Sequence, residues 1–217
     1  MSEGLVGGER LADQAYRRIR DAIVAVELPP GAPLDEKALS SSLGFGLTPI
    51  REALRRLTLE KLAVIYPRRG TFVAAINLSD EARLTEVRLE LEGLAAALAA
   101  ERATEAQRAE LVELAEALVH GSRERVDHTE LDARVHRAIY AAAHNDFLES
   151  SLNQYVNLAL RIWNLSLRDR EADPAHLASQ RAVVDAIVRR DAPAAREAAE
   201  AHLREFSEQV RSVVHRA

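Results

Sequence analysis

One stretch decides the fold: residues 43–57, LGFGLTPIREALRRL, predict a tight turn that leads into a short helix. Apolar residues recur at i, i+3, i+4 and i+7 and so share one side of that helix: Ile50, Ala53, Leu54 and Leu57. The opposite side carries Thr48, Arg51, Glu52 and Arg55. A short helix with one apolar and one cationic face suits the DNA major groove, although a solvated surface helix shows the same pattern.

The start of this helix is marked by Thr48 and Pro49. Thr48 is a suitable N-cap, and proline is favoured at the first helical position because its missing N–H has no intrahelical partner there. We therefore expect the helix to begin at about Thr48. Its first turn would present free backbone N–H groups and Arg51, which can hold phosphate or contact the O6 and N7 atoms of guanine.

Two further helices are predicted upstream. Asp35 can cap a helix that runs through Ser42, and Gly44 can supply the left-handed residue that ends it. Before this helix, apolar residues recur at helical spacing from Leu11 to Val26. They predict another helix, which the Pro29-Pro30-Gly31 segment stops. Two short helices joined by a glycine-containing turn predict a helix-turn-helix.

A β-hairpin is predicted downstream. Residues 63–66 and 71–73 favour β-strands around residues 67–70, a tip that carries two arginines and a glycine. Residues 37–76 hold 7 basic and 2 acidic side chains, a local net charge of +5 in a chain whose overall charge is −5. The sequence therefore predicts a winged helix-turn-helix with a cationic surface.

This region, from about residue 10 to residue 75, resembles the DNA-binding domain of GntR-type bacterial transcription regulators. The resemblance is carried by Gly31, Leu34, residues 36–39, Leu43-Gly44, residues 48–54 and residues 69–73. It implies DNA contacts at Lys37, Thr48, Arg51, Arg69 and Gly70, and Pro49 and Arg55 of the same helix complete the expected DNA-binding set. The chain departs from the family pattern at Gly46 and Leu47, where a Ser or Thr followed by Arg is usual. We therefore expect fewer base-specific contacts per half-site.

Composition suggests two domains, residues 1–76 and 77–217. A chain of 217 residues with 47% hydrophobic content can build two cores. It has no apolar run of about 18 residues and no signal segment at its start, so we expect a cytoplasmic protein without a membrane partner. Its lack of cysteine excludes disulfides and thiolate chemistry.

The second domain is rich in Ala, Leu, Glu and Arg and has almost no β signal. Its pattern predicts an all-α antiparallel helical bundle. The six expected helices cover approximately residues 79–102, 105–120, 127–143, 146–168, 174–190 and 192–214.

Several polar residues fall on the inward faces of these helices. Asp132 and His136 lie at i and i+4 beside an apolar stripe, a spacing that can chelate one metal ion. His202 falls near the centre of the last inward face, and Gln180 lies among inward residues with His176 one turn earlier. Each histidine alone is more simply a hydrogen-bonded core residue. Together they favour a shared ligand, because burying several polar groups without one is costly.

This domain resembles the FCD ligand-binding domain of the FadR branch of the GntR family, and six helices suggest its shorter, VanR-like subgroup. The matching residues are Arg88 with Glu92, Asp132 with His136, Asn145, and His202-Leu203. Many members of that branch hold a divalent metal with one Asp and three His, and the metal helps to bind a small organic acid. Gln180 takes the place of the remaining histidine. The resemblance thus implies a zinc or nickel site with weakened affinity, a site that His176 completes, or a pocket that works without metal.

Two further features leave alternatives open. Arg88 can pair with the carboxylate of an effector, with Gln180 as a second effector contact, or Arg88 can form an intrahelical salt bridge with Glu92. The alanine-rich run from Leu94 to Ala100 permits close helix packing, either between two subunits or within the core.

These features predict a regulator that binds a short pseudo-palindromic operator as a homodimer and responds to a small organic acid, with or without metal. The alternative is a small metalloenzyme in which Asp132, His136 and His202 activate water and the winged helix is an interaction module. The sequence shows no convincing nucleophile or separate general base near these residues. We therefore expect a protein that is not an enzyme.

Overall fold

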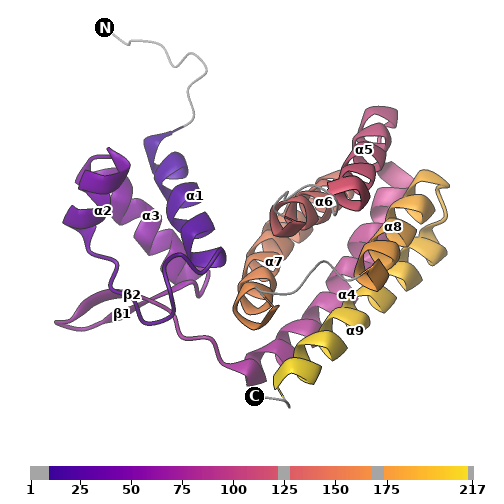
Figure 1. Cartoon of the computed structure of the whole chain (residues 1–217). Coiled ribbons are helices and arrows are strands. Elements are labelled where there is room, and N and C mark those ends of the chain that lie inside the picture. Colours follow the sequence, from indigo (N-terminus) through magenta and orange to yellow (C-terminus); the bar gives the residue numbers. More distant parts are fainter. Residues whose placement is uncertain (1–9, 122–127, 168–173, 215–217) are drawn as a thin grey trace, which may run out of the picture. The chain divides into compact units, whose positions relative to one another are not determined.

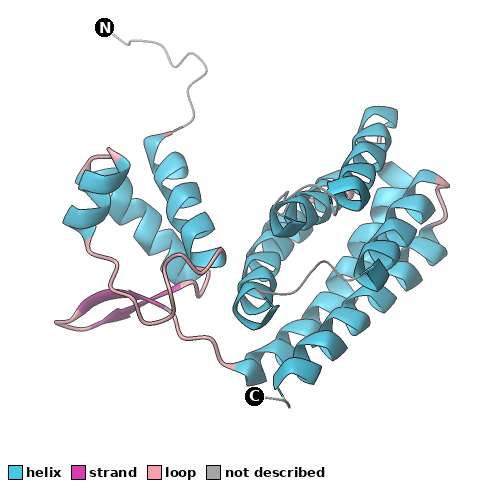
Figure 2. Cartoon of the chain, viewed as in Figure 1, coloured by secondary structure: helices cyan, strands magenta, loops and turns pink. Residues whose placement is uncertain are grey.

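The computed structural model describes residues 10–121, 128–167 and 174–214. The chain divides into two compact units, Met1–Ile76 and Asn77–Ala217. The first unit contains three helices and a hairpin, and the described residues of the second unit form helices and the loops between them; Figures 1 and 2 show this arrangement within each unit. The expected fold class, a winged helix-turn-helix followed by an all-α bundle, is confirmed.

The first unit consists of α1 (Leu11–Val24), α2 (Glu36–Leu43), α3 (Leu47–Leu59), β1 (Ala63–Tyr66) and β2 (Gly70–Val73). The predicted caps of α2 are present. The Asp35 side chain accepts a hydrogen bond from the Ala38 backbone N–H at 2.8 Å, and Gly44 ends the helix with a φ of 74°. The inward face of α3 is buried as expected at Ile50, Ala53, Leu54 and Leu57.

Two predicted helix ends are wrong. Helix α3 begins at Leu47, and its N-cap is Gly46, which makes no side-chain hydrogen bond to the helix. Thr48 and Pro49 are therefore the second and third residues of the helix, so Thr48 cannot act as the N-cap and Pro49 does not occupy the first helical position. Helix α1 ends at Val24, and Val26 has left the helix with a φ of 60°.

A buried polar contact fixes α3 against α1. The Tyr16 hydroxyl donates a hydrogen bond to Glu60 Oε2 at 2.6 Å, and Arg56 Nε donates to Glu60 Oε1 at 3.1 Å. The guanidinium carbon of Arg56 also stands 3.7 Å from the centre of the Tyr16 ring. Burial raises the pKa of Tyr16 to about 12, and the Glu60 carboxylate contributes to the rise, so the hydroxyl remains a donor at neutral pH.

The hairpin pairs antiparallel, with Ala63 opposite Val73 and Tyr66 opposite Gly70. Its turn places Pro67 second and Arg68, with a φ of 64°, third. These are the preferences of a type II turn, and the Arg69 N–H closes it on the Tyr66 carbonyl at 3.0 Å. The segment that joins α1 to α2 runs along β2 through the bridge between Pro33 and Phe72. The wing is thus tied to the helices of its own unit.

The second unit contains six helices among its described residues: α4 (Leu78–Arg102), α5 (Glu105–Gly121), α6 (His128–Ala142), α7 (Asp146–Leu167), α8 (Pro174–Val188) and α9 (Ala192–Val214). Helix α9 packs between α4 and α8, and α6 packs on α5 and α7. Helix α4 approaches α9 closely at Gly93, where an added Cβ would lie 3.2 Å from Glu200 Oε1. The bundle therefore brings α4, α6, α8 and α9 together around one interior.

The predicted helix ranges agree with these bounds to within a residue or two. Residues 127 and 168, the expected start of one helix and end of another, lie outside the described part of the chain. The largest difference is at α8, which ends at Val188 instead of residue 190. Arg190 has a φ of 60°, and the Asp191 N–H bonds back to the Ala186 carbonyl at 3.1 Å. These contacts complete a left-handed helix end.

Candidate nucleic-acid interface and metal centre

The outward face of α3 and Lys37 of α2 carry several of the cationic groups of the first unit. Thr48, Arg51, Arg55 and Lys37 are exposed, and Pro49 is half-buried. Arg51 Nε donates a hydrogen bond to Glu36 Oε2 at 2.7 Å, which joins the recognition helix to α2. Both partners of this ion pair are substantially exposed, so it contributes at most about 1 kcal/mol and can open for a stronger partner.

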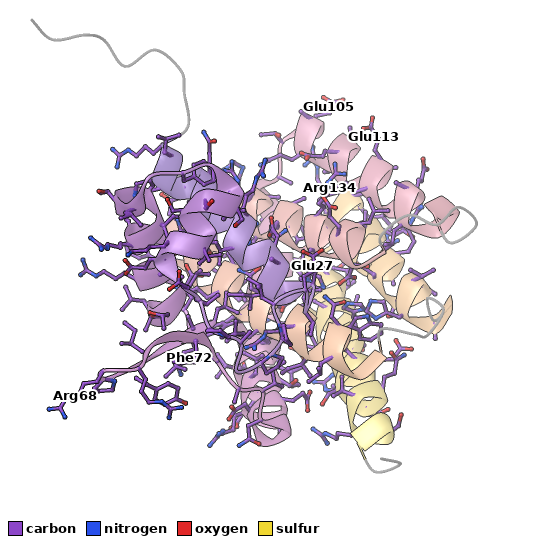
Figure 3. The ribbon with its side chains drawn as sticks, turned by 60° about the vertical axis from the view of Figure 1, so that its left-hand side comes forward. Glu27, Arg68, Phe72, Glu105, Glu113 and Arg134 are labelled. Carbon is purple, nitrogen blue, oxygen red and sulfur yellow. The ribbon has the colours of Figure 1, made fainter. Side chains whose placement is uncertain are left out.

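The wing adds a second cationic point. Arg69 and Gly70 are exposed, and the guanidinium of Arg69 lies 5.8 Å from the Tyr66 ring and 5.9 Å from the Phe72 ring. Figure 3 shows Arg68 at the tip of the hairpin, extended away from it. The sequence reasoning did not include Arg68 among the DNA-binding residues. Its place behind a proline in a tight turn is the signal that could have found it.

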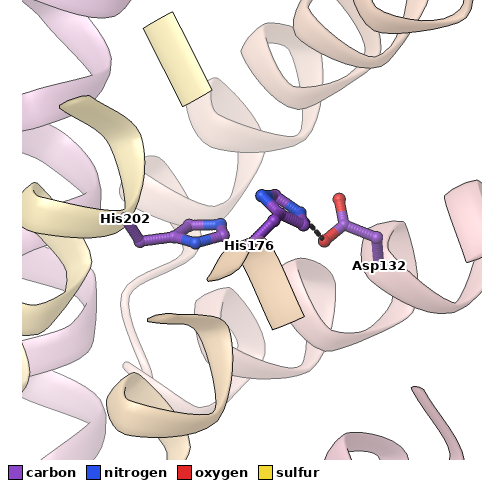
Figure 4. A group of neighbouring side chains, drawn as sticks. All are labelled: Asp132, His176 and His202. Carbon is purple, nitrogen blue, oxygen red and sulfur yellow. Dashed lines mark hydrogen bonds and ion pairs between the residues drawn. The ribbon is translucent and has the colours of Figure 1, made fainter. Parts of the chain in front are cut away.

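Three helices of the second unit bring potential metal ligands together. Asp132 of α6, His176 of α8 and His202 of α9 each offer a ligand atom, and these atoms all lie within 4.8 Å of one another. His176 Nε2 lies 3.2 Å from Asp132 Oδ1, as Figure 4 shows. One carboxylate and two imidazoles are a donor set that zinc and similar divalent ions accept. The residues present therefore fit such an ion.

His136 lies beside this group with a partner of its own. Its Nδ1 atom is 3.1 Å from Glu92 Oε2, and its Nε2 atom is 3.8 Å from Asp132 Oδ2. Because the carboxylate can only accept, the Nδ1 atom of His136 carries the proton in the contact with Glu92. A carboxylate behind a histidine in this way orients the ring, as it does for histidine ligands of metals.

His202 is oriented by Ser179. The Ser179 hydroxyl donates its single proton to the His176 backbone carbonyl at 3.0 Å, so its oxygen accepts from His202 Nδ1 at 2.9 Å. The lone pair of His202 therefore resides on Nε2. Sequence reasoning missed Ser179 and the contact between Glu92 and His136, because both depend on the packing of helices.

Charge and burial give Asp132 and His202 the protonation states that metal ligands need. Burial raises the pKa of Asp132, but the neighbouring histidines outweigh it, so the pKa of this carboxyl lies below its usual range. Burial lowers the pKa of His202 well below its usual value, and the charges of His176 and His136 lower it further. At neutral pH the carboxylate is charged and His202 is neutral, as metal binding requires.

Gln180 lies in the interior next to the cluster. It is 1% exposed, and both its amide oxygen and its amide nitrogen lack a hydrogen-bond partner. It lines a cavity of about 10 Å³, room for about one water molecule, together with Glu92, His136, Tyr140 and His202. A buried amide with two unmet hydrogen bonds is costly, which marks this cavity as a place for a polar ligand.

Arg88 forms the intrahelical pair that the sequence left open. It is 3% exposed, and its Nε donates to Glu92 Oε1 at 2.6 Å. Burial raises the pKa of Glu92, but Arg88 and then His136 outweigh it and lower the pKa to about 2. Glu92 thus stands as a carboxylate between Arg88 and His136, and the Arg88 guanidinium already holds one carboxylate.

Comparison with known proteins assigns both units. Residues 11–73 match the model for bacterial regulatory proteins of the gntR family, and residues 83–205 match the FCD domain. The chain belongs to the GntR family of bacterial transcription regulators. Within that family it carries the FCD domain of the FadR-type branch, as the sequence resemblance indicated.

The relatives of this GntR-family chain extend over nearly its whole length. The HTH-type transcriptional repressor RspR of Escherichia coli K12 is 30% identical over 203 residues, which cover 92% of this chain and 89% of RspR. A regulator from an unstable DNA locus of Streptomyces ambofaciens is 29% identical and covers 87% of this chain and 80% of its own length. The solved structure of E. coli McbR/YncC superposes with a TM-score of 0.81 at 24% identity, covering 96% of this chain and 99% of that one, which supports the fold.

Family membership decides between the two functions that the sequence allowed. Both matched families and the relatives are transcription regulators, so this chain is a DNA-binding regulator and not an enzyme. The metalloenzyme alternative does not hold. Among the described helices, none combines the length and apolar character that a bilayer-spanning segment requires.

Proposed function

We propose that this GntR-family protein acts in the cytoplasm as a homodimeric repressor of a short pseudo-palindromic operator, and that a small organic acid controls it through a divalent metal in the FCD bundle. One observation carries the ligand-responsive part: Asp132, His176 and His202 converge beside the unpartnered amide of Gln180. RspR, the relative that matches 92% of the chain, is named a repressor.

DNA binding is the task of α3 and the wing. Arg51 and Arg55 lie on the exposed face of α3, and Lys37 and Arg69 extend the positive charge on either side. A single winged helix buries little DNA surface, and two symmetric half-sites supply the rest of the affinity. This is the reason to expect a dimer. The alanine-rich run of α4 packs within the core, since Ala95, Ala96, Ala99 and Ala100 are fully buried, and Leu94 remains as an exposed apolar side chain of that helix for a dimer contact.

In the bundle, Asp132, His176 and His202 would hold the ion, with His136 next to them. A bound divalent metal supplies positive charge to which an effector carboxylate can bind. Ser179 accepts from His202 Nδ1 and so leaves the Nε2 lone pair of that ring for an ion, and Glu92 orients the ring of His136. The Gln180 amide can both donate and accept a hydrogen bond, and so can hold a second polar group of the same effector. Arg88 is held by Glu92 and would contact the effector only by exchanging that carboxylate for the effector's own.

The size of the cavity connects ligand binding to conformation. A molecule larger than water needs more room than this cavity offers, so the side chains or helices around it must move for such a molecule to bind. Effector binding therefore favours an arrangement of the helices around Gln180 that differs from the ligand-free one. Such a population shift changes operator affinity by no more than the effector's differential affinity for the two arrangements.

The tryptophan of this chain provides a test of the metal site. Trp163 is the single tryptophan, and its ring stacks on His176 with centroids 5.2 Å apart. We expect zinc to change Trp163 fluorescence in a titration that saturates at one ion per chain. The ion would hold the His176 imidazole in one orientation and would place positive charge next to the indole that stacks on it. The protein is purified without nickel resin or chelator. His176→Ala is expected to lower zinc affinity at least about tenfold, because replacing a residue that only hydrogen-bonds to a metal ligand already costs about tenfold or more.

The matched control is His144→Ala, which removes an exposed histidine that contacts Gln107 and lies outside the cluster. Its zinc titration should coincide with that of the unmodified protein. If neither fluorescence nor metal analysis detects zinc in the unmodified protein, or if both histidine variants bind zinc equally well, the cluster is not a metal site.

A further inference from the structure

The exposed face of α3 begins with a leucine. Leu47 is the first residue of α3 and is 38% exposed, so its side chain is accessible at the start of this helix. The exposed residues that follow over the next turns are polar: Thr48, Arg51, Glu52, Arg55 and Arg56. Leu47 and Arg51 stand at i and i+4, so both side chains lie on the same strip of the surface.

The helix start at Leu47 is open to a close approach. Gly46, the N-cap, has no side chain above the first turn, and no side-chain oxygen bonds to the helix there. Gly46 is itself exposed, and Phe45 before it is half-buried. A DNA strand can therefore come near the backbone of this turn, with the isobutyl group of Leu47 as the first side chain that it meets.

The major groove offers a complementary group for leucine. Base edges there present hydrogen-bond donors and acceptors, and thymine alone adds an exposed methyl group, at C5. A leucine that faced the polar edges would desolvate them without replacing their hydrogen bonds, whereas a leucine against the methyl removes apolar surface from water. We infer that Leu47 is a specificity-determining residue that selects thymine in each half-site through contact with its C5 methyl. The inference rests on DNA binding by α3.

Helix geometry places this thymine relative to the base that Arg51 reads. Four residues along a helix advance about 6 Å, and base pairs along one strand are about 3.4 Å apart. The side chain of Arg51 starts from this strip, and its Nε donates to Glu36 Oε2 at 2.7 Å. The selected thymine therefore lies one or two base pairs from the guanine that Arg51 contacts.

The test removes single methyl groups from DNA. An operator is first selected from random duplexes with the full-length protein, and each thymine is then replaced in turn by deoxyuridine, which lacks the C5 methyl and keeps the base pairing. For the unmodified protein, we expect deoxyuridine at one position of a half-site to weaken binding about fourfold, the effect of one buried methyl-sized group. Leu47→Ala is expected to bind both DNAs equally at that position.

Leu59→Ala is the matched control, because Leu59 is an exposed leucine at the other end of the same helix. This variant should keep the full deoxyuridine effect, and circular dichroism should show that all three proteins are folded. The inference is overturned if Leu47→Ala keeps the same deoxyuridine effect, or if deoxyuridine matters at no position for the unmodified protein. Selection that enriches no sequence at all contradicts the proposed operator instead, and is seen before any methyl is removed.

Discussion

Replacement of Arg51 by alanine is expected to weaken binding to the selected operator by at least about 30-fold. A bidentate contact between arginine and guanine discriminates by about 1–3 kcal/mol, and a dimer makes this contact in both half-sites, so even the lower limit amounts to about 2 kcal/mol. In the free protein the Glu36 carboxylate lies 2.7 Å from Arg51 Nε. The substitution removes this cationic partner, so the negative charge of Glu36 is no longer offset when DNA phosphates approach. Fluorescence anisotropy with a labelled operator at fixed ionic strength measures the change.

Arg204→Ala is the matched control for this experiment. Arg204 is also an exposed arginine in an ion pair, to Glu200 at 2.8 Å, but it belongs to α9 of the FCD bundle. Arg204→Ala changes the net charge by the same amount as Arg51→Ala. It should leave operator affinity within about twofold of that of the unmodified protein. Equal affinities for Arg51→Ala and Arg204→Ala would show that the exposed face of α3 does not read DNA.

Replacement of Asp132 by alanine is expected to abolish most of the stabilisation that zinc gives the protein. Zinc at 100 times its dissociation constant should raise the free energy of unfolding of the unmodified chain by about 2.7 kcal/mol. For a chain of this size that corresponds to a rise in Tm of about 5–11 °C. Asp132 is the one carboxylate among the three converging ligands, so its removal takes away the negative charge that offsets the ion.

Each variant is melted with and without zinc, so that any change in metal-free stability cancels from the comparison. Asp185→Ala is the control, because Asp185 is a more exposed carboxylate on α8 that pairs with Arg181 at 2.8 Å. It should keep the full zinc-dependent rise. A rise of equal size in Asp132→Ala, or none in the unmodified protein, means that zinc does not bind at Asp132.

The first unit could be predicted in detail because its signals are local. The spacing of Ile50, Ala53, Leu54 and Leu57 identifies the buried face of α3, and Asp35 and Gly44 mark the ends of α2 through short-range contacts. The N-cap of α3 was misplaced by two residues because Thr48 is a good N-cap in general, whereas the turn here uses Gly46. A cap is chosen by the path of the backbone before the helix, which residue type alone does not fix.

The bundle interior was predictable only in part. Helical periodicity placed Asp132, His202 and Gln180 on inward faces, and the structure brings them near one another. Periodicity alone did not predict that His176 would reach Asp132, or that His136 would turn one nitrogen toward Glu92. These contacts depend on the rotation and crossing of α4, α6 and α8. The proton position of His202 depends on the contact of its Nδ1 with Ser179 of a different helix, so no spacing rule predicts it.

The salt dependence of operator binding tests the DNA surface most directly. The logarithm of the association constant is measured against the logarithm of salt concentration for the unmodified protein and for the Arg51→Ala/Arg69→Ala double variant. Each guanidinium that neutralises a phosphate contributes about 0.9 to the slope. Loss of Arg69 from both subunits of the proposed dimer should therefore reduce its magnitude by about 1.8, and by up to about 3.6 to the extent that Arg51 neutralises phosphate besides its contact with guanine, together with a large loss of affinity. Unchanged affinity and an unchanged slope would show that α3 and the wing are not the DNA-binding surface.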